Sequence, residues 1–333
     1  METLKTGSFF ALWYLFNIGY NIYNKKALNA LAIPYTMALL QLAVGIPYAG
    51  ALWLTGLRKT PKLSKDDIKT LIPVSLGHLG THIGAVISLG AGAVSFTHII
   101  KASEPVVSAG LSAVMLGAVY SPITYATLLP IVGGVALASL KELSFTWLGF
   151  WAAILSNVSS ALRAILAKKT MNKGVGENMT EANLYAVLTI LATIFLLPVS
   201  LLIETPATIM AAINGALAGG ATSGYLWTAR RAQFGGHSAQ LARRNSPTPH
   251  IPPRSQVSLL AGAFYYLYNE VAFLALDRVN PVTHAVGNTI KRVVIIIASV
   301  IAFKTPISTL GVVGSSIAIF GTLLYSLAKN KYG

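Results

Sequence analysis

The sequence predicts an all-α membrane protein with ten transmembrane helices in two inverted five-helix repeats. The first observation is composition: 54% of the 333 residues are hydrophobic and 11% are charged, whereas a soluble domain typically has about 25% charged residues. The second is a series of ten apolar stretches, each near the roughly 20 residues that a helix needs to cross a bilayer. The third is that short motifs of the first half recur, in the same order, in the second half.

Polar or glycine-containing connections separate the predicted spans. Ser64, with Asp67 three residues later, predicts a capped helix start before the third span. Residues 90–93, Gly-Ala-Gly-Ala, predict a tight link between the third and fourth spans. The ten spans are placed at about residues 7–24, 33–57, 69–90, 93–117, 121–140, 146–167, 181–204, 256–277, 281–303 and 307–328.

The distribution of loop charges predicts the orientation of the chain. Loops on the side of the two chain ends contain more Lys and Arg than loops on the other side, for example Arg58, Lys59 and Lys168 against Lys25 and Lys26. The positive-inside rule then puts both termini on the cytoplasm-equivalent side, which is the interior in an organelle of bacterial descent. The formal net charge of +15 follows from this bias, so membrane lipid is an expected partner and nucleic acid is not.

Two pairs of motifs predict the internal repeat. Residues 25–29, after the first span, resemble residues 168–172 after the sixth, and Thr97-His98 of the fourth span resembles Thr283-His284 of the ninth. The repeats are therefore placed at residues 1–145 and 146–333, and five spans in each half make the halves insert in opposite senses. Inverted repeats are typical of transporters that bind substrate between the halves, near the middle of the membrane.

Two segments fall outside this pattern. Residues 229–255 contain five Arg, four Pro and no acidic residue, which predicts a disordered insertion. This insertion is either a basic regulatory loop or the product of a retained intron or a gene-model error. Residues 1–6 lead directly into the first span, so we expect that a leader has been removed or lies outside this sequence.

Adjacent cations in the ninth span are the strongest indication of function. Lys291 and Arg292 interrupt an otherwise apolar segment, and each costs on the order of 3 kcal/mol at membrane depth. They point about 100° apart on a helix, so they do not easily share one acidic partner. A guanidinium fork and an ammonium point charge are the groups that bind phosphate oxygens.

The formal charge inside the spans also fits a phosphate ester. Four cations face two carboxylates, a surplus of two positive charges, and a phosphate ester carries about −1.5 to −2 near neutral pH. The cations are Lys101, Arg163, Lys291 and Arg292, and the carboxylates are Glu104 and Glu270. Two less specific interpretations remain open. In one, Lys101 pairs with Glu104, three residues later; in the other, Arg163 reaches out to the membrane surface.

No metal or other cofactor is expected. Cysteine is absent from the sequence and the carboxylates of the spans are too few for a cation site. His78 and His82 have the i,i+4 spacing of metal ligands, but packing or substrate hydrogen bonding accounts for them better without an acidic or thiolate ligand beside them. Tyr265, Tyr266, Tyr268 and Asn269 are candidates to line a polar pocket.

Several stretches resemble the plastid phosphate translocators of the drug/metabolite transporter superfamily. They are residues 21–26 (NIYNKK), 94–101 (VSFTHIIK), 266–270 (YLYNE) and, most specifically, 279–293 (VNPVTHAVGNTIKRV). The resemblance implies a multi-pass protein of the plastid inner envelope that is not an enzyme. It implies strict exchange of a phosphorylated C3 compound or sugar phosphate for inorganic phosphate, with triose phosphate favoured.

The resemblance also implies the binding residues. Lys101, Lys291 and Arg292 would bind the phosphoryl group, while Tyr268 and His82 would contact the rest of the substrate. Family members that favour phosphoenolpyruvate look to have Asn at the position of His82. By this resemblance, the His82 of this chain indicates a preference for triose or sugar phosphates. Ala85 stands where some triose-phosphate members have a small polar residue, which leaves a hexose- or pentose-phosphate preference open.

Rival functions remain at this stage. A nucleotide-sugar transporter of the same superfamily would be distinguished by competition of UMP or GMP against phosphate. A membrane-embedded transferase acting on a lipid phosphate would be active without a transport partner. A passive anion channel would conduct without a counter-ion. The oligomeric state is not indicated by the sequence.

Overall fold

The computed structural model describes residues 2–140, 142–171, 174–217, 254–276 and 281–332. Every regular element in these ranges is a helix, and the one β contact is an isolated bridge between Lys62 and Glu177. Residues 229–253 of the predicted insertion lie outside the described residues. The helices are α1 (Glu2–Ala30), α2 (Pro34–Ala43), α3 (Gly45–Leu54), α4 (Lys65–Ala91), α5 (Val94–Lys101), α6 (Glu104–Leu116), α7 (Pro122–Ala126), α8 (Leu128–Leu140), α9 (Trp147–Met171), α10 (Glu181–Ile203), α11 (Pro206–Leu217), α13 (Arg254–Leu276), α14 (Pro281–Phe303) and α15 (Thr309–Tyr332).

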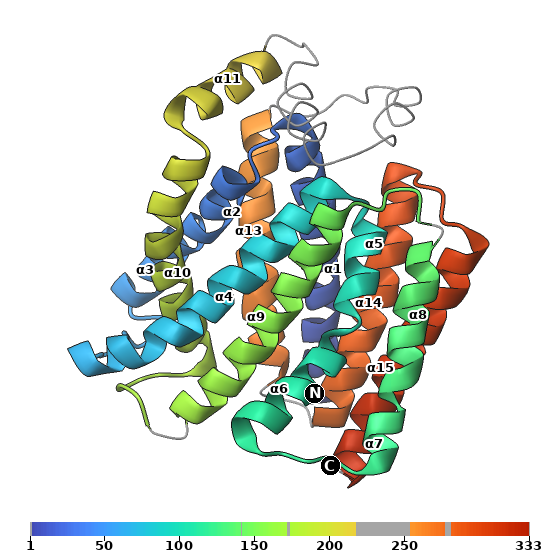
Figure 1. Ribbon diagram of the computed structural model, residues 1–333. Coiled ribbons are helices and arrows are strands. Elements are labelled where there is room, and N and C mark those ends of the chain that lie inside the picture. Colours follow the sequence, from blue (N-terminus) through green and yellow to red (C-terminus); the bar gives the residue numbers. More distant parts are fainter. Residues whose placement is uncertain (1, 141, 172–173, 218–253, 277–280, 333) are drawn as a thin grey trace.

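The all-α membrane class is confirmed. In the described ranges, eight helical segments are long and apolar enough to cross a membrane, formed by α2–α3, α4, α5–α6, α7–α8, α9, α10, α14 and α15. The other two predicted spans coincide with α1 and α13, helices of 29 and 23 residues. The count of ten therefore stays a prediction. Both chain ends lie at the same end of the bundle (Figure 1), as the loop charges predicted.

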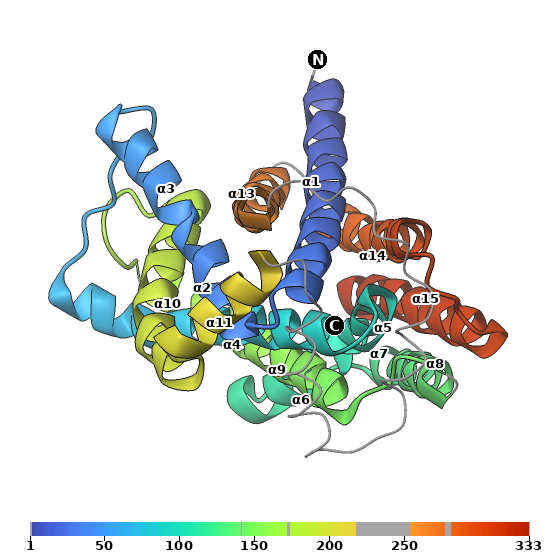
Figure 2. The ribbon, with the colours of Figure 1, turned by 90° about the horizontal axis from the view of Figure 1, so that it is seen from above.

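Figure 2 shows α1, α4, α9 and α13 in the middle of the bundle, with α3 and α10 on one side and α8, α14 and α15 on the other. The closest pairs are α4 with α9, α1 with α13, and α8 with α15. If the predicted repeat is applied, α4 corresponds to α13 and α9 corresponds to α1, so exchange of the halves turns the first pair into the second. The third pair maps onto itself under the same exchange.

Small residues permit the closest helix contact. A Cβ atom at Gly134 of α8 would collide with the backbone of Gly314 and Ala318 on α15, and a Cβ at Gly314 would collide with the backbone of Gly134 and Ala138. Glycine at both positions lets the two backbones touch, which is how helices associate without a hydrophobic driving force in lipid.

The starts of α4 and α2 are capped in different ways. Ser64 caps α4 with the predicted box: its hydroxyl accepts from the Asp67 N–H, and the Asp67 carboxylate accepts from the Ser64 N–H. The start of α2 is capped from a distance, because the Glu204 carboxylate accepts from the N–H groups of Tyr35 at 3.0 Å and Thr36 at 2.7 Å. Glu204 lies at the end of α10 and is buried, in addition to the two acids that the sequence places well inside the spans.

The predicted fourth span is two helices rather than one. α5 ends at Lys101 and α6 begins at Glu104. Pro105 lacks the N–H that would bond the Lys101 carbonyl in a continuous helix, and its ring would clash with that carbonyl. The break thus places a cation at one helix end and a carboxylate at the next helix start. Transporters typically build substrate sites at such discontinuous helices.

Other predicted boundaries also needed correction. The second and fifth spans are each two helices, α2–α3 and α7–α8, and α11 was not predicted. The first helix continues past the predicted end at residue 24 to Ala30. Lys25 therefore lies in α1 and not in a loop. The Lys25 ammonium donates to the carbonyls of Leu89 at 2.8 Å and Gly92 at 2.7 Å, at the C-terminal end of α4. The tight link predicted at residues 90–93 is confirmed, and only residues 92–93 lie between α4 and α5.

Candidate substrate-binding site

A cavity of about 360 Å³ lies between the helices. Its walls come from α1, α4, α5, α6, α9, α13 and α14, and therefore from both predicted halves of the chain. All five sequence-predicted site residues line it: His82, Lys101, Tyr268, Lys291 and Arg292. The structure thus brings together residues that lie up to 210 positions apart in the sequence.

Helical periodicity explains why each helix presents polar groups here and apolar groups elsewhere. On α5, Thr97, His98 and Lys101 line the cavity, while Phe96 and Ile100 are fully buried on the other side of the helix. This i, i+1, i+4 spacing gathers side chains on one face. On α14, Asn288, Lys291 and Arg292 follow the same rule. Neighbouring side chains 291 and 292 both reach the cavity, although they diverge.

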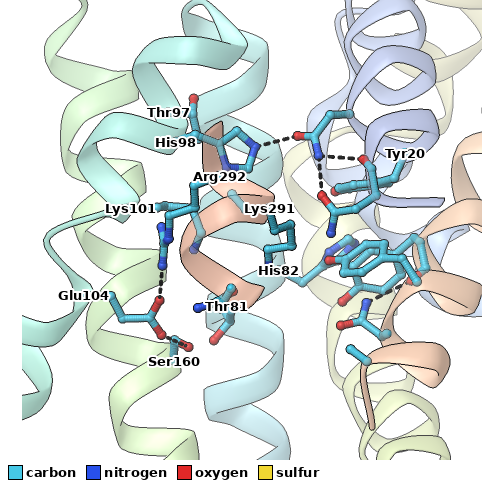
Figure 3. A pocket seen from close by; sticks show the side chains of 18 of the residues that line it. Tyr20, Thr81, His82, Thr97, His98, Lys101, Glu104, Ser160, Lys291 and Arg292 are labelled. Carbon is cyan, nitrogen blue, oxygen red and sulfur yellow. Dashed lines mark hydrogen bonds and ion pairs between the residues drawn. The ribbon is translucent and has the colours of Figure 1, made fainter. Parts of the chain in front are cut away.

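The three predicted phosphoryl-binding cations gather on one side of the cavity (Figure 3). The Lys101 ammonium donates to the Ser156 hydroxyl at 2.7 Å. The Arg292 guanidinium donates to Glu104 Oε2 at 3.1 Å. The Lys291 ammonium lies 4.7 Å from the centre of the Trp13 ring, within the range of a cation–π contact. Each cation therefore has a different support, and Lys291 and Arg292 have different partners, as their divergence on the helix predicted.

Glu104 joins the two halves at this point. Its second carboxylate oxygen accepts from the Ser160 hydroxyl at 2.6 Å. The structure records an ion pair between Glu104 and Arg292 of α14 and none between Glu104 and Lys101. The interpretation in which Lys101 simply pairs with Glu104 is therefore wrong, because the break after Lys101 turns the two side chains to different partners.

The charge balance of the cavity also differs from the sequence count. Glu270 forms an ion pair with Arg58, which the sequence had placed in a polar loop, and neither lines the cavity. Arg58 therefore compensates the charge of Glu270 outside the cavity. Arg163 does line the cavity instead of reaching the membrane surface. Among the described lining residues, four cations face the single carboxylate of Glu104, a formal surplus of three rather than two.

The histidines have defined hydrogen-bonding roles. His82 Nε2 lies 3.2 Å from the Ala38 carbonyl, and its ring centre is 4.1 Å from that of Tyr265. A carbonyl oxygen only accepts, so Nε2 carries the hydrogen and the buried Nδ1, which has no partner, is an acceptor. His98 Nε2 contacts Asn21 Oδ1 at 2.8 Å. His78 packs edge-on against Tyr185. The side chain of His284 lies outside the described residues.

An aromatic wall faces the cations. Tyr265 and Tyr268 of α13 line the cavity together with Asn269, as predicted. Tyr266 does not: it is buried on the opposite face of α13 against Tyr48 and Tyr185, because consecutive side chains of a helix diverge by about 100°. The sequence also missed Tyr20 of α1, whose ring centre lies 5.3 Å from those of Tyr265 and Tyr268.

Comparison with known proteins decides the family. The profile of the Triose-phosphate Transporter family matches residues 4–326, nearly the whole chain. The chain belongs to the Triose-phosphate Transporter family. This membership confirms the resemblance that the motifs around Lys101 and Lys291 carried, and it extends it from short stretches to the full length.

The names of three relatives state different organic substrates. A chloroplastic phosphoenolpyruvate/phosphate translocator 1 of Oryza sativa subsp. japonica is 39% identical over 332 residues, which are 98% of this chain and 72% of the relative. A chloroplastic glucose-6-phosphate/phosphate translocator 1 of Arabidopsis thaliana is 37% identical over 98% of this chain and 76% of the relative. A chloroplastic triose phosphate/phosphate translocator of Spinacia oleracea is 40% identical over 98% and 73%.

These relatives are translocators of the chloroplast rather than enzymes. The predicted location, a multi-pass membrane protein of a plastid, agrees with them and with the membrane-spanning helices of this Triose-phosphate Transporter family member. A solved crystal structure shares the fold with a TM-score of 0.52 over 99% of this chain and 98% of its own, at 11% identity.

Proposed function

We propose that the protein is an antiporter that exchanges a phosphorylated metabolite for inorganic phosphate across the plastid inner envelope membrane. The convergence of Lys101 from one half with Lys291 and Arg292 from the other in a single cavity carries this proposal. A dianionic phosphoryl group is the ligand that offsets such a cluster at membrane depth. The translocator relatives support the same assignment.

Each predicted residue has a place in this proposal. Lys101, Lys291 and Arg292 bind the phosphoryl group, and Tyr268 and His82 contact the remainder of the substrate. The free Nδ1 of His82 accepts a hydrogen bond from a substrate hydroxyl. Triose phosphates and sugar phosphates carry such a hydroxyl, whereas phosphoenolpyruvate carries none, so we favour triose phosphate as the organic substrate.

Charge neutralisation couples substrate binding to the change of access. In the empty carrier the surplus positive charge opposes closure of the cavity, because desolvating unpaired cations is costly. Bound phosphate or phosphate ester offsets that charge and allows the halves to switch access. Since only the loaded carrier crosses between states, exchange is obligatory. The division into repeats of residues 1–145 and 146–333 is part of this proposal, and the exchange symmetry of the helix pairs supports it.

The size of the cavity bears on the rival functions. About 360 Å³ is at the small end of ligand sites, which favours a small phosphorylated metabolite over a nucleotide sugar or a lipid phosphate. Hexose phosphate remains the second candidate, because Ala85 of the cavity wall leaves more room than a larger polar residue. We therefore propose a transporter in contact with membrane lipid, with no catalytic activity and no cofactor.

A panel of counter-substrates tests the function. The purified protein is reconstituted in vesicles loaded with phosphate, and uptake of labelled phosphate is measured against external triose phosphate, 3-phosphoglycerate, phosphoenolpyruvate, glucose 6-phosphate and UMP. We expect triose phosphate to compete best and UMP not to compete. Absence of phosphate exchange, or the strongest competition by UMP, contradicts the proposal.

A further inference from the structure

The Lys101 ammonium is held by a serine that is not among the described lining residues of the cavity. Ser156 of α9 is fully buried, and its hydroxyl oxygen accepts from the ammonium at 2.7 Å. The same hydroxyl donates to the Thr81 carbonyl of α4 at 2.8 Å. A hydroxyl has a single hydrogen to donate, so this bond leaves its lone pairs for the ammonium. One serine therefore connects α4 with the cation at the end of α5.

The contact between α4 and α9 fixes the position of this serine. Both α4 and α5 pack against α9 (Figure 1). A Cβ atom added at Gly84 of α4 would come within 2.9 Å of the Ser156 N atom and 2.7 Å of the Ala152 carbonyl oxygen. The two backbones thus touch beside Ser156, and helix packing sets where its hydroxyl lies. A free lysine side chain, by contrast, has one of the largest rotamer entropies of any residue.

The next residue of α9 holds the backbone on both sides of Lys101. Asn157 Nδ2 donates to the Ile100 carbonyl at 3.1 Å and lies 3.2 Å from Ser103 Oγ. The helix that holds the ammonium therefore also holds the chain from which the lysine projects. An ammonium has three N–H donors, so the bond to Ser156 leaves two for phosphoryl oxygens.

We infer that Ser156 is a positioning residue of the phosphate site: it fixes the Lys101 ammonium in the geometry that binds a phosphoryl group, without touching the ligand. An ammonium that is ordered beforehand loses less entropy when the ligand binds. This inference rests on the proposed function of the same cavity. Lys101 contacts the phosphoryl group that all substrates share, so loss of the Ser156 hydroxyl weakens the binding of each by the same factor. A bound phosphoryl group holds Lys101 itself, so the rate at saturation is maintained.

Two buried serines of α9 provide a matched pair of variants. Ser159, like Ser156, packs against α4, since a Cβ at Gly80 would come within 2.4 Å of the Ser159 Oγ atom. Initial rates are measured in phosphate-loaded vesicles over a range of labelled phosphate, with and without external triose phosphate. We expect Ser156→Ala to raise the KM for phosphate and the inhibition constant of triose phosphate by the same factor, about 3- to 10-fold, as loss of one hydrogen bond does. The maximal rate should stay within about twofold, and Ser159→Ala should leave both constants within about twofold.

A third variant separates the hydroxyl from the space that it fills. Ser156→Cys retains a side chain of similar size, but a thiol is a weak acceptor, so both constants should rise nearly as much as in Ser156→Ala. Lys101→Gln should raise them further, because it removes the group through which Ser156 acts. Lys169→Gln removes an exposed cation of α9 outside the cavity and should change neither constant.

Several results would overturn the inference. They are unchanged constants in Ser156→Ala, unequal factors for the two ligands, equal shifts in Ser159→Ala, or constants of the unaltered protein in Ser156→Cys. Failure of Ser156→Ala to fold while Ser159→Ala folds would also overturn it, because the hydroxyl would then support the fold rather than the cation. Failure of the proposed function is distinct, since the unaltered protein would then not exchange phosphate.

Discussion

At the scale of single residues, the two adjacent cations of α14 make the sharpest claim. Lys291→Ala and Arg292→Ala each remove one charge-assisted contact to phosphate, worth about 1.5–3 kcal/mol. We therefore expect phosphate self-exchange in reconstituted vesicles to fall at least about tenfold in each. Arg292→Lys should be intermediate, because it keeps the charge and loses the fork. Full activity in either alanine variant, with Lys169→Gln as the control, would falsify the assigned role.

His82 predicts substrate choice at the same scale. His82→Phe keeps a ring against Tyr265 and removes the Nδ1 acceptor. One hydrogen bond is worth about 0.5–1.5 kcal/mol, so competition by triose phosphate should weaken about 2- to 10-fold. Phosphoenolpyruvate has no hydroxyl and should compete as before, which makes it the internal control for the loss of the Ala38 contact. A parallel loss for both substrates would show that His82 only shapes the cavity.

Residue types and spacing were sufficient to predict five residues that line one cavity. Lys101, Lys291 and Arg292 stood out because charge is costly in an apolar helix. The partners of those charges were not predictable, because partners come from other helices: Glu104 binds Arg292, which is 188 positions away. Arg163 was ambiguous for the same reason. A cation eight residues before the end of its helix, Met171, fits both a surface and a cavity position until α4 packs against it.

At the scale of elements, the ion pair of Arg58 and Glu270 connects the segment between α3 and α4 with α13. The side chains are 18% and 5% exposed, so removing one partner leaves a nearly buried charge and costs about 3–5 kcal/mol. We expect Arg58→Gln and Glu270→Gln each to lower the Tm of the purified protein in detergent. The double variant should be more stable than the sum of the two losses implies, because neither charge is then left alone. Strict additivity would show that the pair is not coupled.

A neighbouring contact provides the matched comparison for that pair. Lys62 and Glu177 also connect the two halves at this end of the bundle, with a distance of 2.8 Å between the charged atoms. The hydrogen bond and the charge of Glu177 raise the pKa of the Lys62 ammonium. Both side chains are exposed, 73% and 69%, and exposed pairs contribute little to stability. Glu177→Gln should therefore leave the Tm nearly unchanged.

Helices were predictable as elements and their interruptions were not. Apolar length located the eight helical segments of the described residues that are long and apolar enough to cross a membrane, and Ser64 with Asp67 located the start of α4. Proline did not reveal the breaks, because Pro73 and Pro198 lie inside unbroken helices while Pro105 begins a new one. The difference is tertiary: after Lys101 the chain has polar partners on α9, where Asn157 Nδ2 donates to the Ile100 carbonyl at 3.1 Å and lies 3.2 Å from Ser103 Oγ.

At the scale of the whole molecule, the predicted exchange of the halves would relate packing to the proposed transport. The sequence repeat paired Thr97-His98 with Thr283-His284, which aligns Lys101 with Gly287 rather than with Lys291. The cations are thus not repeat mates, and only the folded arrangement brings them to one cavity. A Cβ at Gly287 would collide with the Phe10 ring of α1, so this turn of α14 packs tightly against α1 and has no room for a second lysine. The two halves therefore supply different parts of one site.

This asymmetry leads to a prediction about the transport cycle. A cavity with three uncompensated positive charges closes only around an anion, so net uptake without a counter-substrate should be slow. Vesicles loaded with phosphate should take up labelled triose phosphate at least about tenfold faster than vesicles loaded with uncharged buffer, since a barrier difference of about 1.4 kcal/mol already gives that ratio. Initial rates of uptake into the two vesicle populations provide the measurement. Equal rates would show that the empty carrier returns freely and that charge neutralisation does not control the change of access.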